Sequence, residues 1–234
     1  MRRRTRNGMW SAALLACLLL PSCATAPAPS RPTVVTRPRP ATAWPRREIL
    51  DLALRAYQCG QAKGEISQPI LTVIDYSMPS TSKRLWVIDL TRRKILFNEL
   101  VAHGVNSGDT YPSAFSNVVG SRQTSLGLFR TDEPYYGRHG LSLRLSGLET
   151  GVNDKARERA IVMHGAPYVS DATVSTYGRL GRSWGCPALP EHVNRQVIDR
   201  IQYGSAVFAY YPDRQWLRTS RYLNNCDTRW ARQG

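Results

Sequence analysis

Short runs of β-branched and aromatic residues recur from position 70 onward, and they constrain the fold of this 234-residue chain more than any other feature. Such runs, bounded by turn residues, are typical of β-strands. They are ILTVIDY (70–76), RLWVIDL (84–90), KILFNELVAHG (94–104), GLFRT (127–131), LSLRLSG (141–147), RAIVMHG (159–165) and SAVFAYY (205–211). The polar segment TRRK joins the second and third runs, which predicts a hairpin.

Only two segments have helical spacing. REILDLALRAYQCG (47–60) repeats apolar residues at Leu50, Ala53, Leu54 and Tyr57, and PEHVNRQVIDRIQYG (190–204) does so from Val193 to Ile201. Strands dominate without a regular strand–helix alternation. We therefore expect a mostly-β domain with a few helices (α+β), built on a mixed sheet or sandwich.

Two long segments, 103–126 and 165–189, interrupt the strands. Loops of this length are uncommon in a compact domain and are usually functional or mobile. Cys186 lies at the end of the second segment.

The first 45 residues do not look like part of a core. Residues 1–22 join an arginine-rich start to an apolar run of 12 residues, from Met9 to Leu20, which is too short to span a bilayer and is typical of an export signal. The sequence LPSC resembles a bacterial lipobox and predicts lipidation of Cys23, while cleavage after ATA at 24–26 is the alternative. Residues 23–45 are rich in proline and alanine and predict a tether, which leaves 46–234 as one domain.

The formal net charge is +15, or +11 once the four arginines of residues 1–22 are removed. Such an excess favours an anionic neighbourhood. The arginines are scattered and form no recognisable nucleic-acid motif. For an exported protein we therefore expect cell-wall polymers and a membrane surface, reached through the lipid anchor, as partners rather than nucleic acid.

Three cysteines remain for the domain, since Cys17 leaves with the signal and Cys23 is assigned to lipid. An odd number in an oxidising compartment leaves at least one thiol unpaired. Cys59 and Cys226 flank the domain, where a disulfide closes the longest loop, although three pairings are open. With this pairing Cys186 is the free thiol.

The surroundings of Cys186 fit a nucleophile. A catalytic thiol needs a base and donors for the developing oxyanion. His164 ends the apolar run AIVMH, and Gly185 lets a substrate carbonyl approach the N–H groups of Gly185 and Cys186. Ser183 is able to orient the histidine or bind substrate backbone. The pattern predicts acyl transfer through a thioester.

These residues resemble the H-G … S-x-G-C signature of YkuD-type L,D-transpeptidases, in HGA (164–166) and SWGC (183–186). The ordered segments AHGVNSG, FSNVVGSRQTSLGLFRT, YYGRHGLSLRLSGLE, GVNDKARERAIVMHGA and GRSWGCPAL are similar to the murein L,D-transpeptidase catalytic domain branch. The resemblance spans most of residues 48–223.

The resemblance implies a β-rich domain that acts on peptidoglycan stem peptides without a cofactor. Cys186 would attack the carbonyl of the third stem residue and release D-alanine, with His164 as base, Gly185 in the oxyanion loop and Ser183 as the motif serine. Carbapenem-type β-lactams would be covalent inhibitors. The better-known signature has histidine and arginine where this chain has Trp184 and Ala188, which weakens inference about the donor site.

Several further residues are candidates for substrate binding. They are Ser116, Asn117 and Ser125 in a turn-rich loop, His139, Trp184, and Arg144, with Arg179 and Arg182 as other sources of the missing charge. No close-spaced pair of metal ligands is present, so we expect no metal site.

Other functions remain open. An L,D-carboxypeptidase of the same fold would pass the acyl group to water, and a non-catalytic wall-binding lipoprotein would retain only the fold. A papain-like protease is disfavoured because His164 precedes Cys186 and no helix is predicted to begin at the thiol.

Overall fold

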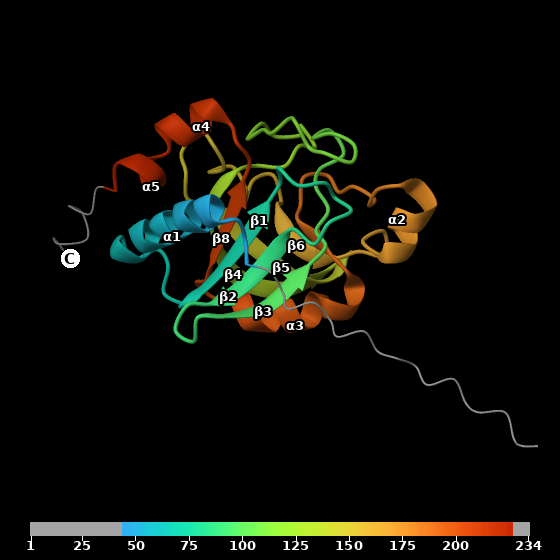
Figure 1. Ribbon diagram of the computed structural model, residues 1–234, viewed down its shortest axis with the longest axis horizontal. Helices are drawn as coiled ribbons and strands as arrows, with labels where there is room; N and C mark the ends of the chain where they lie inside the picture. The colour runs from blue at the N-terminus through green and yellow to red at the C-terminus, as the bar shows by residue number, and fades with distance from the viewer. Residues whose placement is uncertain (1–43, 227–234) are drawn as a thin grey trace, which may run out of the picture. The chain divides into compact units, whose positions relative to one another are not determined.

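Figure 1 shows the computed structural model, which describes residues 44–226. The predicted signal, most of the predicted tether and the predicted lipidation site Cys23 lie outside the described residues. Eight strands form one sheet in the order β3-β2-β1-β8-β4-β5-β6-β7. The strands are β1 (Ile70–Asp75), β2 (Leu85–Asp89), β3 (Lys94–Glu99), β4 (Gly127–Gly137), β5 (Gly140–Gly147), β6 (Val162–Gly165), β7 (Ala188–Leu189) and β8 (Ala206–Tyr210). The prediction of a mostly-β domain with a few helices is confirmed.

The sheet is mixed because its last long strand inserts into the middle. β8 pairs in parallel with β1 and antiparallel with β4 (Figure 1). β1, β2 and β8 are buried along their whole length, which explains their continuous apolar sequences. β2 and β3 form the predicted hairpin, and β4 and β5 form a second one.

Two helices bury apolar side chains against the sheet. α1 (Arg47–Ala62) packs against β1 and β8, and α3 (Glu191–Ile201) packs against β5, β6 and β1. α1 buries Ile49, Ala53, Ala56 and Tyr57, so its buried stripe is rotated slightly from the predicted one. The short helices are α2 (Asp171–Tyr177), α4 (Arg214–Thr219) and α5 (Arg221–Asn224). Within residues 44–226, no helix is long and apolar enough to cross a bilayer.

A disulfide joins α1 to the segment that follows α5. Cys59 and Cys226 are bonded, with their Cα atoms 5.5 Å apart, across 167 residues of sequence. Cys186 is a free, partly buried thiol. The disulfide therefore ties together the two ends of the described chain and leaves the candidate nucleophile unpaired.

Candidate active site

Cys186 lies in a tight turn that Ser183 braces from inside. The Ser183 hydroxyl donates to the Cys186 carbonyl at 2.6 Å and accepts from the Gly185 N–H at 3.1 Å. The turn is anchored to the preceding loop, because the Ser183 N–H donates to the His103 carbonyl at 2.9 Å. The role of the Ser183 hydroxyl in this conformation is thus to shape the turn.

Gly185 is required by both its conformation and its neighbours. Its φ is +119°, a region that disfavours side chains, and a Cβ atom there would lie 2.7 Å from the Gln123 carbonyl. The Gly185 N–H, predicted as an oxyanion donor, is bonded to Ser183. Among residues 44–226, no group accepts a hydrogen bond from the Cys186 N–H, so this donor is available to a developing oxyanion.

Strand pairing brings the thiol alongside the predicted base. β6 and β7 are parallel, with His164 opposite Ala188, and the Val162 N–H donates to the Cys186 Sγ at 3.5 Å. Val162 and His164 are two residues apart, or about 7 Å along a strand. The thiol donates to the Ala160 carbonyl at 3.6 Å, and no hydrogen bond joins it to the imidazole within the described chain. Such catalytic bonds often tighten only when substrate binds.

His164 is buried and held as a neutral base. Its Nδ1 lies 2.9 Å from the Gly165 carbonyl, which only accepts, so Nδ1 carries the proton and Nε2 has a free lone pair. The His139 ring stacks on it, with centroids 4.4 Å apart. Burial lowers the pKa of His164, the Gly165 hydrogen bond opposes this, and the charges of His139 and Arg138 lower the pKa further.

The thiol is also neutral at rest. Burial raises the pKa of Cys186, against the Val162 N–H and the positive charges of Arg159 and Arg138, which lower it. The shifts of both pKa values favour a protonated thiol and a neutral imidazole as the resting forms.

Arg159 is a cation that sequence reasoning did not identify. Its guanidinium is partly buried, and within residues 44–226 no carboxylate pairs with it. It donates to the Ser116 and Gln123 carbonyls and to the Ser125 and Ser121 hydroxyls. Its Nη2 lies 3.4 Å from where a Gly185 Cβ would be. Arg159 therefore fastens the 116–125 loop behind the thiol turn.

The loop candidates form bonds inside the protein. The Ser125 hydroxyl donates to the Ser116 carbonyl at 2.9 Å. The Asn117 amide donates to Asp154 at 2.7 Å and accepts from the Lys155 N–H at 3.1 Å. In this conformation these groups secure the loop, and their predicted contacts with substrate remain a prediction.

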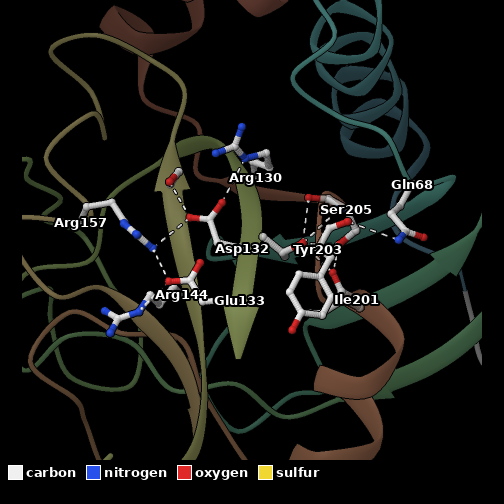
Figure 2. Close-up of polar contacts among 11 residues, drawn as sticks. Gln68, Arg130, Asp132, Glu133, Arg144, Arg157, Ile201, Tyr203 and Ser205 are labelled. Atoms are coloured by element: carbon white, nitrogen blue, oxygen red, sulfur yellow. Dashed lines mark hydrogen bonds and ion pairs between the residues drawn. The ribbon is translucent and has the colours of Figure 1, made fainter. Parts of the chain in front are cut away.

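The three arginines proposed from the sequence as replacement cations are all paired with carboxylates. Arg144 bonds Glu133 at 2.9 Å and covers the Tyr135 ring, within a network on the β4–β5 hairpin that Figure 2 shows. Arg179 and Arg182 both bond Asp109, at 2.7 and 3.2 Å. The charges that act on the thiol are instead those of Arg159 and Arg138.

Trp184, two residues before Cys186, is exposed to solvent. The residue is 59% exposed, and the guanidiniums of Arg122 and Arg138 lie 4.4 and 5.3 Å from the centre of its ring. Among residues 44–226, no group of three or more His, Cys, Asp or Glu side chains is arranged to hold a metal ion. The site thus offers one thiol, one neutral base, one free N–H donor and a cationic rim, a set suited to acyl transfer.

Comparison with known proteins gives a family match. The profile of a family described as the L,D-transpeptidase catalytic domain matches residues 43–210. No curated protein sequence matches the chain.

Solved structures also match, at low identity. They include an L,D-transpeptidase from Mycobacterium smegmatis, with 15% identity over 61% of this chain and 59% of that one and a TM-score of 0.37. The helical cell shape determining protein from Campylobacter jejuni matches with 15% identity over 68% of this chain and 56% of that one, at a TM-score of 0.41. L,D-transpeptidase 3 from Mycobacterium tuberculosis, in complex with a faropenem-derived adduct, matches with 13% identity over 61% of this chain and 60% of that one, at a TM-score of 0.38. The chain spans 56–60% of the length of these structures.

Proposed function

The chain belongs to the L,D-transpeptidase catalytic domain family, and from this premise we propose that it modifies peptidoglycan with Cys186 as nucleophile and His164 as general base. One observation carries the assignment of roles. The hydrogen bond between His164 Nδ1 and the Gly165 carbonyl leaves Nε2 unprotonated, on the strand that runs alongside the free thiol.

The reaction follows from these groups. As Cys186 Sγ bonds to the carbonyl carbon of the third stem residue, the thiol proton passes to His164 Nε2 and the Cys186 N–H donates to the oxyanion. The bond to the terminal D-alanine breaks, and the proton on Nε2 passes to the departing amine. An acceptor amine then attacks the thioester, gives its proton to Nε2 and frees the sulfur, whose thiolate takes that proton back.

The acceptor distinguishes the related activities. An amine of a neighbouring stem gives a cross-link, whereas water gives an L,D-carboxypeptidase. Incubation with a diamino-acid tetrapeptide, followed by mass spectrometry, separates a cross-linked from a trimmed product. Release of D-alanine by the wild type and none by Cys186→Ala supports the proposal. Release of D-alanine by both proteins, or by neither of them, contradicts the proposal. If neither protein releases D-alanine, a wall-binding protein without activity is favoured.

A papain-like protease is less well supported. The residues that follow Cys186 form the two-residue strand β7 before α3 begins at Glu191, so no helix starts at the thiol. Cleavage of casein without release of D-alanine would favour this alternative.

Export and membrane attachment belong to the same proposal. The arginine-rich start, the 12-residue apolar run and the sequence LPSC support an exported lipoprotein anchored through Cys23, in the periplasm or on the outer face of a bacterial membrane. Cys23→Ala should release the protein from membranes, and persistent association would contradict the anchor. Carbapenems should acylate Cys186, because a strained lactam carbonyl is an acyl donor to the same sulfur.

A further inference from the structure

Trp184 and its two arginines form a feature that the acyl-transfer chemistry does not use. The indole is 59% exposed, although large aromatic side chains are usually covered. Arg122 and Arg138 approach its ring at 4.4 and 5.3 Å. We refer to Arg122, Trp184 and Arg138 as the clamp.

The two guanidiniums of the clamp carry uncompensated charge. Within residues 44–226, no Asp or Glu forms an ion pair with either of them, whereas Arg144, Arg179 and Arg182 are all paired. The Arg138 Nε donates to the neighbouring His139 ring at 3.1 Å, which does not neutralise it. Two unpaired arginines with a shared aromatic wall suit a planar anion, above all a carboxylate.

The clamp is held close to the nucleophile. Trp184 is two residues before Cys186, and a Cβ on Gly104 would lie 2.5 Å from the Arg122 carbonyl and 3.0 Å from the Gly185 Cα. Arg122 is therefore separated from the thiol turn by a single glycine. The charge of Arg138 also reaches the thiol and the base, since it lowers the pKa of both Cys186 and His164.

The backbone at Arg122 is held by the surrounding loop. Its φ is +55°, an uncommon conformation for a residue with a side chain. Arg159 bonds the residues on either side, Ser121 and Gln123, and the Arg122 carbonyl accepts from the Asn106 N–H at 3.2 Å. A strained residue held on both sides is a feature of ligand clamps.

We propose that the clamp binds a free carboxylate of the donor stem peptide. This inference rests on the proposed function, which supplies the donor. The proposal is confined to the two carboxylates that belong to the residues on either side of the bond that breaks: that of the leaving D-alanine and that on the side chain of the diamino acid. The indole would pack against the aliphatic part of the same residue.

Three donors separate the two sources: the tetrapeptide acid, its D-alanine amide, and the peptide amidated at the diamino-acid side chain. Amidation of the bound carboxylate should lower the wild-type kcat/KM roughly ten- to hundredfold, because charge-assisted hydrogen bonds are lost. In Arg122→Gln/Arg138→Gln the acid should react more slowly, mainly through a higher KM, and the difference between acid and amide should largely disappear. Which amide is the poor donor identifies the carboxylate.

The matched control is Arg214→Gln, since Arg214 is an exposed arginine on α4 without an ion pair within the described chain. This variant should keep the wild-type ratio of kcat/KM between the acid and the amidated donors. Thermal melting checks that each variant is folded. The assay is run above the pKa range of histidine, so that loss of Arg138 does not act through His164. If the acid/amide ratio is the same in the wild type and the double variant, the clamp proposal is overturned while the proposed function stands. If no donor releases D-alanine, the proposed function fails and the clamp proposal with it.

Discussion

Replacement of Ser183 by alanine tests whether the bracing of the thiol turn matters for reactivity. The side chain is buried, and its hydroxyl makes two hydrogen bonds inside the turn, to the Cys186 carbonyl at 2.6 Å and from the Gly185 N–H at 3.1 Å. Alanine fits the same space but leaves both backbone groups without these partners. The turn would then lose what fixes the direction of Cys186.

The expected magnitude follows from those two bonds. An unsatisfied buried polar group costs about 1–3 kcal/mol, so loss of both bonds should lower the free energy of unfolding by about 2–6 kcal/mol. If about half of this appears in the transition state for acylation, the barrier rises by about 1–3 kcal/mol and the rate falls roughly 5- to 150-fold. Urea denaturation measures the first quantity, and intact-mass kinetics of carbapenem acylation measure the second.

Ser205→Ala is the matched control. Ser205 is also buried, lies immediately before β8, and donates from its hydroxyl to the Ile201 carbonyl at 2.6 Å (Figure 2). Within residues 44–226, no hydrogen bond joins it to the thiol turn. This variant should also lose stability, although less than Ser183→Ala because the Ile201 carbonyl keeps the hydrogen bond from the Thr131 hydroxyl, and it should keep the acylation rate. Acylation of Ser183→Ala at the wild-type rate, or an equal slowing in Ser205→Ala, would refute a role of the Ser183 hydroxyl in orienting the thiol.

Three further predictions concern pH, the disulfide and packing. Because burial and the charge of His139 lower the pKa of His164 below 6.5, the acylation rate should fall only below that pH. His139→Phe keeps a stacked ring without charge and should move the midpoint of the pH–rate profile upward; an unchanged midpoint contradicts the coupling. Cys59→Ser/Cys226→Ser opens a loop of 167 residues and should cost about 2–5 kcal/mol in thermal unfolding. Carbapenem should still label Cys186 while that variant is folded, and loss of labelling would show that the disulfide positions the site. Gly147→Ala would place a Cβ in steric overlap with the Asn153 carbonyl, so denaturant unfolding should show a loss of about 1–3 kcal/mol, and wild-type stability would mean that this packing relaxes freely.

The long elements were predictable because their patterns are local. The run at 70–76 corresponds to β1 and that at 84–90 to β2, while the spacing at 190–204 corresponds to α3. β4 continues beyond the predicted 127–131 because its register shifts between Thr131 and Pro134, which accommodates a proline in a strand. β7 has two residues, too few for any pattern, and its pairing with β6 is set by tertiary structure. α2 lies inside the predicted loop 165–189.

Residue type, residue order and the family resemblance together single out Cys186, His164 and Gly185 in the sequence, and their catalytic roles stay predictions. The structure places the Cys186 sulfur against the N–H of Val162, two residues before His164 on β6. The cationic surroundings were not predictable, since the identity of the free arginines depends on which carboxylates the fold brings near the others. Arg144 meets Glu133 across a hairpin, whereas Arg159 meets only backbone carbonyls and hydroxyls.

The most direct test of the account is an acid-quenched reaction of the wild-type protein with the tetrapeptide donor, followed by peptide mapping. We predict a thioester on Cys186 with the mass of the donor minus D-alanine, and its accumulation should fall sharply in His164→Ala. An acyl group on another residue, or D-alanine released with no acylated Cys186 at any quench time, would contradict the nucleophile on which the account rests.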